Sequence, residues 1–424
     1  MRRFLPLWIG QLLSQIGSGL TTFGLGVWVY QETGSVTRFA LIALFSTFPG
    51  IVAAPFAGLV VDRFSKRAVL CCTNLGSGAV VAAIAALLAR GALSPWHLYL
   101  LLGVSSVLQA VHWPALIASS TALVEPALLS RTSGMIQLGD AASRIAAPSL
   151  AGLLLASLHL WGLLLVDMAS FAVGALSVLL TPGLPAAPQA PPEAGKASPL
   201  AGLGEGWRFL RGEAGLLALL VAFAGFNFID GVVQVLLTPL VLSFSSPSAL
   251  GVVVSCAGLG ILAGSLTASL LPAPRERVRW ILGLSLAQAA ILAVGGLRPS
   301  LALVGAAVVG YASCSPLVNA FSQSLWQERA PLEIQGRVFA LRRMVAWSTL
   351  PLAYGLAGPL ADHVLEPWFA PGGLLASLVG SWFGTGKGRG IAFLFSALGL
   401  LAAAGQLVAA RYRPLRDLDL PPAA

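Results

Sequence analysis

Long apolar runs separated by short polar turns dominate the pattern along the chain. Each run is long enough to cross the hydrocarbon core of a bilayer as a helix, which takes about 20 residues. Backbone amides inside lipid must pair within their own segment, and the runs lack β alternation, so helices are favoured over a barrel. The pattern predicts an all-α membrane protein with twelve transmembrane helices near residues 5–29, 39–61, 69–89, 96–119, 132–157, 160–181, 215–240, 249–271, 280–296, 300–324, 338–365 and 389–410.

The composition supports this class, because a soluble fold needs more charge on its surface. The chain has 424 residues, of which 57% are hydrophobic and only 10% are charged, and its mean hydropathy is +0.86. Its first residues, MRRFLPLWIGQLLSQIG, have the basic start of a signal peptide, but the apolar stretch continues to about Tyr30. We therefore expect an uncleaved first helix.

The net charge of +9 matters less than where the charges fall. With the N-terminus inside, most Lys and Arg residues lie on the cytoplasmic side or at its membrane edge, and Arg144 lies within a span. This asymmetry follows the positive-inside rule, so both termini are expected in the cytoplasm and the chain in the inner (plasma) membrane. The basic charge is therefore attributed to topology, and no nucleic-acid partner is expected. The outer side keeps five cations: Arg38, Arg90, Arg298, Lys387 and Arg389.

One long polar interruption divides the predicted spans into two sets of six. Its first part is rich in Pro and Ala, which favours a flexible linker, and Leu203 to Leu210 have the pattern of a short amphipathic helix on the inner membrane surface. We predict a six-helix half over residues 1–181, a cytoplasmic linker with this helix over 182–214, and a second six-helix half over 215–424. The halves echo each other weakly, as in duplicated transporters, so a monomer is expected.

A short charged turn, GLVVDRFSKR, joins the second and third predicted spans. It resembles a signature of the major facilitator superfamily in five residues, with Ser65 where that family usually has Gly. The segments LWIGQLLSQIGSGL, VYQETGSV, VHWPALIASSTALVEPALL and GEGWRFLR resemble the drug/proton antiporter branch, which includes macrolide-efflux proteins and enterobactin exporters. The five matching residues are Gly58, Asp62, Arg63, Lys66 and Arg67.

The resemblance implies that this turn is a gating motif, a latch that is broken and remade as the transporter alternates access. Gly58 leaves room for close helix approach. Asp62 can face helix N-termini, and the three cations suit the cytoplasmic headgroup zone. The alternative is that the turn is only a positive-inside anchor.

A second signature of the family, in the fifth span, is matched only in part. The segment GDAASRIAAPSLAG provides Gly139, Pro148 and Gly152, but Ala147 replaces the first Gly of the Gly-Pro pair. Small residues permit close packing, and a proline bends a helix and frees a carbonyl. A dedicated coupling element and a plain kinked packing helix are both consistent with this segment.

Ionisable side chains within the spans are costly in lipid and are therefore functional candidates. Asp140 and Arg144 lie four residues apart, on one face of the fifth span, where Asp140 can carry a proton or both can contact substrate. Asp230 in the seventh span is a second candidate for proton coupling, and the polar stripe that Asn227 and Gln234 form beside it is a candidate lining of the substrate cavity. The alternatives are a permanently ionised pair and an interhelical hydrogen bond.

Four further side chains are candidates for the substrate cavity, because the first and fourth spans line the cavity in this superfamily. They are Gln15, Gln109, His112 and Trp113. A histidine beside a tryptophan can bind an aromatic substrate, although a lone histidine is more often a hydrogen-bonded packing residue.

Residues 366–390 interrupt the last two predicted spans on the outer side. Trp368, Trp382 and Phe383 suit an interfacial belt of aromatic residues. The segment can cap the outer mouth of the transporter, although a passive re-entrant loop is the simpler interpretation.

The sequence favours a transporter over an enzyme, since no phosphate-binding loop, catalytic triad or Cys/His metal cluster is recognisable. No cofactor or metal is expected. We expect a secondary exporter of amphipathic small molecules, such as drugs, macrolides, siderophores or secondary metabolites, that works by proton antiport. Its partners are then the substrate, protons and the lipid bilayer. Two alternatives are flipping or uptake of a lipid-like substrate by the same fold, and a non-transporting receptor or assembly partner.

Overall fold

The computed structural model describes the chain except for residues 1–2, 126–127, 185–198, 271–273, 332–333 and 421–424. Every regular element of the described residues is a helix. The described chain forms two compact units, one made of Met1–Ala194 with Ser246–Ser255, the other of Gly195–Ser245 with Cys256–Ala424. Residues 185–198 of the predicted linker lie outside the described residues.

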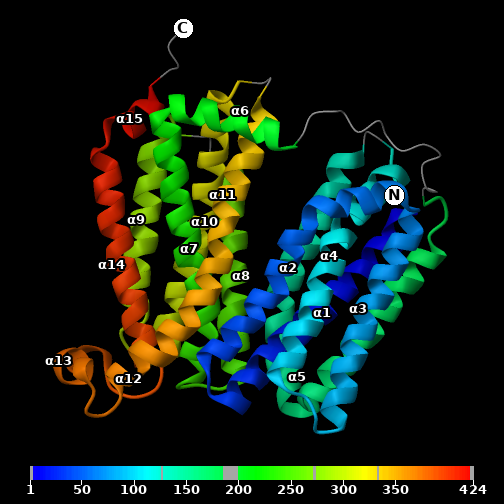
Figure 1. Ribbon diagram of the computed structural model, residues 1–424, viewed down its shortest axis with the longest axis horizontal. Coiled ribbons are helices and arrows are strands. Elements are labelled where there is room, and N and C mark those ends of the chain that lie inside the picture. Colours follow the sequence, from blue (N-terminus) through cyan, green and yellow to red (C-terminus); the bar gives the residue numbers. More distant parts are fainter. Residues whose placement is uncertain (1–2, 126–127, 185–198, 271–273, 332–333, 421–424) are drawn as a thin grey trace. The chain divides into compact units, whose positions relative to one another are not determined.

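The first unit is built on long helices that run side by side (Figure 1). Its elements are α1 (Phe4–Thr33), α2 (Val36–Arg63), α3 (Lys66–Ala89), α4 (Pro95–Leu123) and α5 (Leu129–Leu180). Serine residues begin two of these helices: Ser35 accepts the Arg38 N–H and Ser65 accepts the Ala68 N–H, each at 3.2 Å. Each serine thereby satisfies a free N–H of the first helical turn.

The second unit contains the remaining helices, and α6 and α15 lie at the opposite end from α12 and α13 (Figure 1). The first turns of α8 belong to the segment that is grouped with the first unit. The elements are α6 (Pro199–Gly212), α7 (Ala214–Leu242), α8 (Pro247–Leu270), α9 (Arg277–Gly295), α10 (Leu301–Arg329), α11 (Gln335–Leu360), a π-helix (Ala361–Leu365), α12 (Glu366–Phe369), α13 (Leu374–Phe383), α14 (Arg389–Arg411), α15 (Arg413–Arg416) and a 3-10 turn (Asp417–Asp419).

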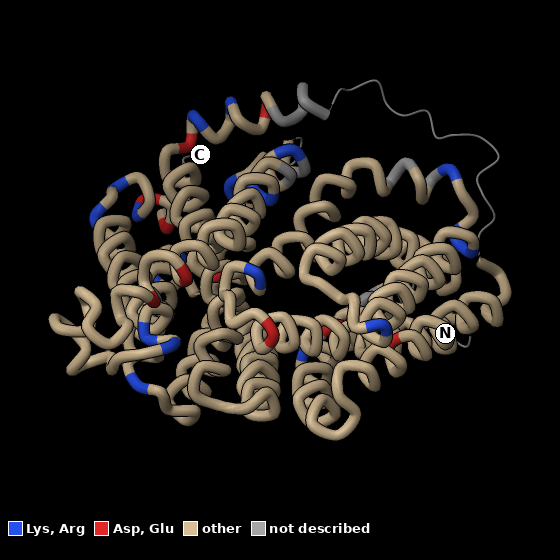
Figure 2. The backbone as a smooth tube through the Cα atoms, turned by 60° about the horizontal axis from the view of Figure 1, so that its bottom comes forward, with Lys and Arg blue, Asp and Glu red and all other residues tan. Residues whose placement is uncertain are grey.

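Where the structure describes the chain, twelve helices correspond to the twelve predicted spans once α5 is counted as two. Ten helices of the described residues are long and apolar enough to cross a membrane. One of them, α5, is two helices joined at His159, where φ is 53° and the direction of the backbone breaks. The eleventh predicted span is α11 with its π-helical extension. Figure 2 shows long stretches of helix without charge, as hydrocarbon requires. The predicted fold class is confirmed.

Close helix contacts at glycine hold the first unit together. A Cβ at Gly10 of α1 would lie 2.3 Å from Cβ of Ser177 in α5, and one at Gly17 would lie 2.8 Å from Oδ1 of Asp167. Asp167 is 1% exposed and accepts a hydrogen bond from Ser170 Oγ at 3.2 Å. At these glycines the backbone of α1 packs directly against side chains of α5, and small residues permit such close approach of helices in lipid.

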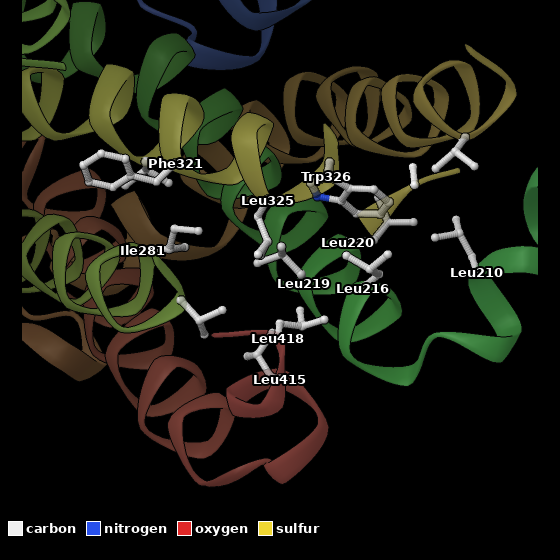
Figure 3. Close-up of a cluster of buried hydrophobic side chains, with 14 of the residues drawn as sticks. Leu210, Leu216, Leu219, Leu220, Ile281, Phe321, Leu325, Trp326, Leu415 and Leu418 are labelled. Atoms are coloured by element: carbon white, nitrogen blue, oxygen red, sulfur yellow. The ribbon is translucent and has the colours of Figure 1, made fainter. Parts of the chain in front are cut away.

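The second unit has a continuous apolar core near the end where α6 and α15 pack (Figure 3). Leu210 of α6, Leu216 of α7, Trp326 of α10 and Leu415 of α15 are at most 1% exposed. An ion pair between Arg337 and Glu205 adds a polar link between α11 and α6. Leu210 thus places the amphipathic helix against the unit's own core.

Candidate functional site

A polar cavity of about 210 Å³ lies inside the first unit. Helices α1, α3, α4 and α5 surround it. Its volume is sufficient for several water molecules, each of which occupies about 30 Å³ in the liquid. The lining residues are Gln11, Ser14, Gln15, Thr73, Asn74, Ser77, Gln109, His112, Trp113, Leu116, Asp140 and Phe171.

All four side chains predicted for the substrate cavity on α1 and α4 line this cavity, and so does Asp140. Residues 109, 112 and 113 lie on one helical face because they are spaced by three and four positions. His112 Nδ1 is 2.7 Å from Thr73 Oγ1, so this histidine has a hydrogen-bonded partner on α3. Sequence reasoning missed Thr73, Asn74 and Ser77, although their i, i+1, i+4 spacing in an apolar helix was a visible signal.

Asp140 reaches the cavity as one half of an ion pair. Arg144 Nε lies 3.0 Å from Asp140 Oδ2, one helical turn along α5, as their spacing predicted. The Arg144 side chain is 69% exposed, compared with 44% for Asp140. The carboxylate therefore faces the polar cavity while its partner extends away from the protein interior.

A second polar cavity, of about 120 Å³, lies inside the second unit. Helices α7, α9, α10 and α14 surround it, and its polar lining residues are Asn227, Asp230, Ser285, Gln288, Tyr311, Ser315, Asn319 and Gln406. Both Asp230 and Asn227 were predicted from the sequence. No Lys or Arg is among the lining residues that the structure describes.

Neutral side chains hold Asp230 in place. Gln234 Nε2 donates to Asp230 Oδ2 at 2.7 Å, and the Tyr354 hydroxyl donates to Gln234 Oε1 at 3.4 Å. On the other wall, Gln288 Nε2 donates to Ser315 Oγ at 2.9 Å. Sequence reasoning missed Tyr354 and Gln288, because no pattern along the chain indicates which helix faces α7.

The charged turn between α2 and α3 is tied to nearby backbone. Lys66 Nζ donates to the Val61 carbonyl, and Arg67 Nη2 donates to the Thr181 carbonyl at 2.7 Å, while Arg63 is exposed. Ser65, at the position where the family usually has Gly, begins α3 as its N-cap. The surroundings of Gly58 and the side chain of Asp62 lie outside the described part of the chain.

The predicted kink motif lies on α5, where Pro148 interrupts the helical hydrogen bonds. Ser255 Oγ accepts the Ser149 N–H at 3.1 Å and donates to the Ile145 carbonyl at 2.5 Å, so a side chain bridges the helix beside the proline. Gly139 faces Trp8, from which a Cβ would be 3.4 Å. A Cβ at Gly152 would lie 2.9 Å from the Pro247 carbonyl oxygen, which leaves no room for a larger residue.

Known proteins match nearly the whole chain. Macrolide efflux protein A of Streptococcus pyogenes is 25% identical over 386 residues, which cover 88% of this chain and 93% of that protein. The multidrug efflux pump Tap of Mycolicibacterium fortuitum is 28% identical over 378 residues, 83% of this chain and 87% of that protein.

Solved structures share the fold at low sequence identity. The nucleoside transporter NupG superimposes with a TM-score of 0.68 over 97% of this chain and 100% of its own, at 14% identity. A bacterial homologue of the iron transporter ferroportin, in its inward-facing state, gives 0.67 over 97% and 99%, at 15% identity. Residues 7–355 match the model of the Major Facilitator Superfamily. The members of this family are transporters and not enzymes. The chain is therefore a multi-pass membrane protein that belongs to the Major Facilitator Superfamily.

Proposed function

We propose that this chain is a secondary active exporter of amphipathic small molecules and that it works by proton antiport with alternating access. The observation that carries the proposal is that each unit encloses a polar cavity with an aspartate in its wall, Asp140 in one and Asp230 in the other. Ionisable groups inside apolar helices cost several kcal/mol, and a scaffold has no need of them. The similar efflux proteins support the direction of transport.

Asp230 is the side chain best suited to carry the proton. Its hydrogen-bonding partner is the neutral amide of Gln234, and among the described residues it forms no ion pair. A carboxyl group with neutral partners can gain or lose a proton without leaving a cation unpaired nearby. Protonation then removes a charge from the interior of the helix bundle, which couples proton occupancy to the conformation that exposes the cavity.

Asp140 and Arg144 form a second, different coupling element. Protonation of Asp140, or approach of a cationic substrate, competes with the 3.0 Å contact to Arg144. Release of Arg144 changes the charge at the edge of the first cavity. Each proton moved inward supplies about 2.3 kcal/mol per 100 mV of membrane potential, and a pH gradient adds to this.

The first cavity offers the chemistry that an amphipathic substrate needs. Trp113 provides an aromatic surface, and Gln15 and Gln109 provide amide donors and acceptors. In this proposal the protein lies in the inner membrane as a monomer with both termini in the cytoplasm, and the turn from Gly58 to Arg67 is the latch of the alternating-access cycle.

Proteoliposomes test the proposal directly. Purified protein is reconstituted with a pH-sensitive dye inside and an imposed pH gradient, and a panel of macrolides, cationic dyes and siderophores is added. We expect substrate-dependent proton movement that is lost in Asp230→Asn and reduced in Asp140→Asn. Asp417→Asn is the matched control, because Asp417 is an exposed aspartate on the 3-10 turn and lines neither cavity.

Substrate binding separates loss of coupling from loss of fold. Quenching of tryptophan fluorescence by the same compounds should persist in Asp230→Asn. Full proton-coupled transport by that variant would refute the assigned role. Substrate movement without protons in the unmodified protein would exclude antiport while leaving transport intact.

A further inference from the structure

A third pocket, of about 410 Å³, lies at the end of the second unit where α7 ends and α14 begins. It is separate from the two aspartate cavities and shares no lining residue with them. The α9–α10 turn and the segment from α13 to α14 complete its wall. Its polar and charged lining residues are Ser243, Arg298, Thr385, Lys387 and Arg389.

Three cations converge on this pocket, and no carboxylate is among its described lining residues. Arg389 is only 4% exposed, and the hydrogen bond and the ring contact of its guanidinium are both to neutral groups: the Phe383 carbonyl at 3.4 Å and the Phe244 ring at 5.9 Å. Within the described chain, none of the three cations forms an ion pair. A buried guanidinium with one long hydrogen bond retains several unused donors.

Glu366 approaches Arg389 and offsets part of its charge. The oxygens of this carboxylate are already used, because Oε2 accepts the Gly388 N–H at 2.9 Å and Oε1 accepts the Ile391 N–H at 3.3 Å. Glu366 thus caps the start of α14. Arg298 and Lys387 have no comparable counter-charge among the described residues, so the pocket keeps an excess of positive charge.

The backbone around the pocket is fixed by its glycines. Gly384, Gly386 and Gly388 have φ values of 82°, 103° and 81°, which other residues rarely adopt. A Cβ at Gly388 would lie 2.1 Å from Ser243 Oγ, so this turn packs directly on the end of α7. Phe383 is buried against Phe369 and Phe393. The sequence had suggested that Phe383 lies in an interfacial aromatic belt, and its burial contradicts that expectation.

The helix beside the pocket has an unpaired apolar face. Leu374, Leu378 and Trp382 repeat every four residues along α13 and are 65%, 70% and 76% exposed. A short helix with such a face lies in the membrane interface, and tryptophan is enriched there. Trp382 also lines the pocket, which therefore opens at the depth of lipid headgroups.

We propose that this pocket binds the phosphate group of an anionic phospholipid. Arginine and lysine donors suit phosphate oxygens, and the apolar face of α13 suits the acyl chains of the same molecule. On the topology expected from the sequence, three of the five outer-side cations meet here. Bound lipid then joins α7, α13 and α14 at one membrane surface.

The test uses delipidated, full-length protein in detergent and native mass spectrometry. We expect phosphatidylglycerol to bind in preference to phosphatidylcholine. The double variant Arg298→Gln, Lys387→Gln should weaken phosphatidylglycerol binding by at least about tenfold, since each cation near a membrane surface contributes roughly 1 kcal/mol. Both side chains are exposed, so the variant should fold. Arg90→Gln, an exposed arginine in the first unit, is the control and should leave binding unchanged.

Three results would overturn the proposal. The first is equal binding of phosphatidylglycerol and phosphatidylcholine to the unmodified protein. The second is undiminished preference for phosphatidylglycerol in a folded double variant. The third is saturable binding of inorganic phosphate, sensitive to the double variant, without any binding of phosphatidylglycerol, which would assign the pocket to a free anion.

Discussion

Replacement of Gly399 by alanine tests how closely α9 and α14 are packed. A Cβ at this position would lie 2.5 Å from the Ala293 backbone nitrogen and 2.6 Å from the Ala289 carbonyl oxygen, whereas ordinary contacts are 3.4–4 Å. Both neighbours are backbone atoms of α9, so no side-chain rotation can make room. The two helices must move apart by roughly 1 Å. That movement also stretches the bond from Ser396 Oγ to the Ala293 carbonyl, now 2.6 Å.

The cost follows from these contacts. Forcing an extra methyl group into a packed interface costs about 1–3 kcal/mol. Weakening one interhelical hydrogen bond in a membrane protein adds about 0.6 kcal/mol. The helix gains back up to about 1 kcal/mol because alanine is a better helix former than glycine. We expect Gly399→Ala to destabilise the protein by about 1–3 kcal/mol.

Gly405 provides a control in the same helix. It is exposed, and a Cβ there would meet nothing within 4 Å. Gly405→Ala should therefore be neutral or stabilising by up to about 1 kcal/mol. The two variants should differ by about 1–4 kcal/mol, at least about fivefold in the unfolding equilibrium. Unfolding in mixed micelles with increasing SDS, followed by circular dichroism, measures this difference. Equal stability of the two variants would refute the close packing of α9 and α14.

Two further predictions concern titration and a buried hydrogen bond. Burial raises the pKa of the Glu366 carboxyl above its ordinary value of 4.5, so the folded chain binds that proton more tightly than the unfolded chain. The contribution of Glu366 to stability then falls as pH rises through the pKa of the unfolded chain and then that of the folded chain. Glu366→Gln lacks this titration, so its thermal midpoint should rise relative to that of the unmodified protein between about pH 4 and neutral pH. A relative fall over this range would contradict the prediction. Thr73→Val removes the partner of His112 and should cost about 1–3 kcal/mol in the same SDS titration, whereas Thr267→Val, an exposed threonine bonded within its own helix, should change little.

The sequence by itself predicted the helices, because what a membrane-spanning helix requires of its residues is local to each segment. A bilayer demands about 20 apolar residues with paired amides, and this demand is met or failed within each segment. The break in α5 at His159 lies between the predicted spans 132–157 and 160–181, because the two apolar segments could be recognised separately. Spacing along one helix likewise placed Asp140 and Arg144 on one face, where they form an ion pair. Gln109, His112 and Trp113 were instead chosen from the family resemblance, and all three line one cavity.

Contacts between helices could not be predicted in this way. The sequence identified Asp230 but not Tyr354 or Gln288, which come from helices with no local signal for facing α7. Arg298, Lys387 and Arg389 looked like isolated outer-side charges, and their shared pocket depends on how α13 and its glycine turn pack on the end of α7. Helix formation is set by residues a few positions apart, whereas a cavity depends on which faces of distant helices meet. The sequence therefore determined the spans and their polar faces, and the tertiary structure decided which polar groups share a site.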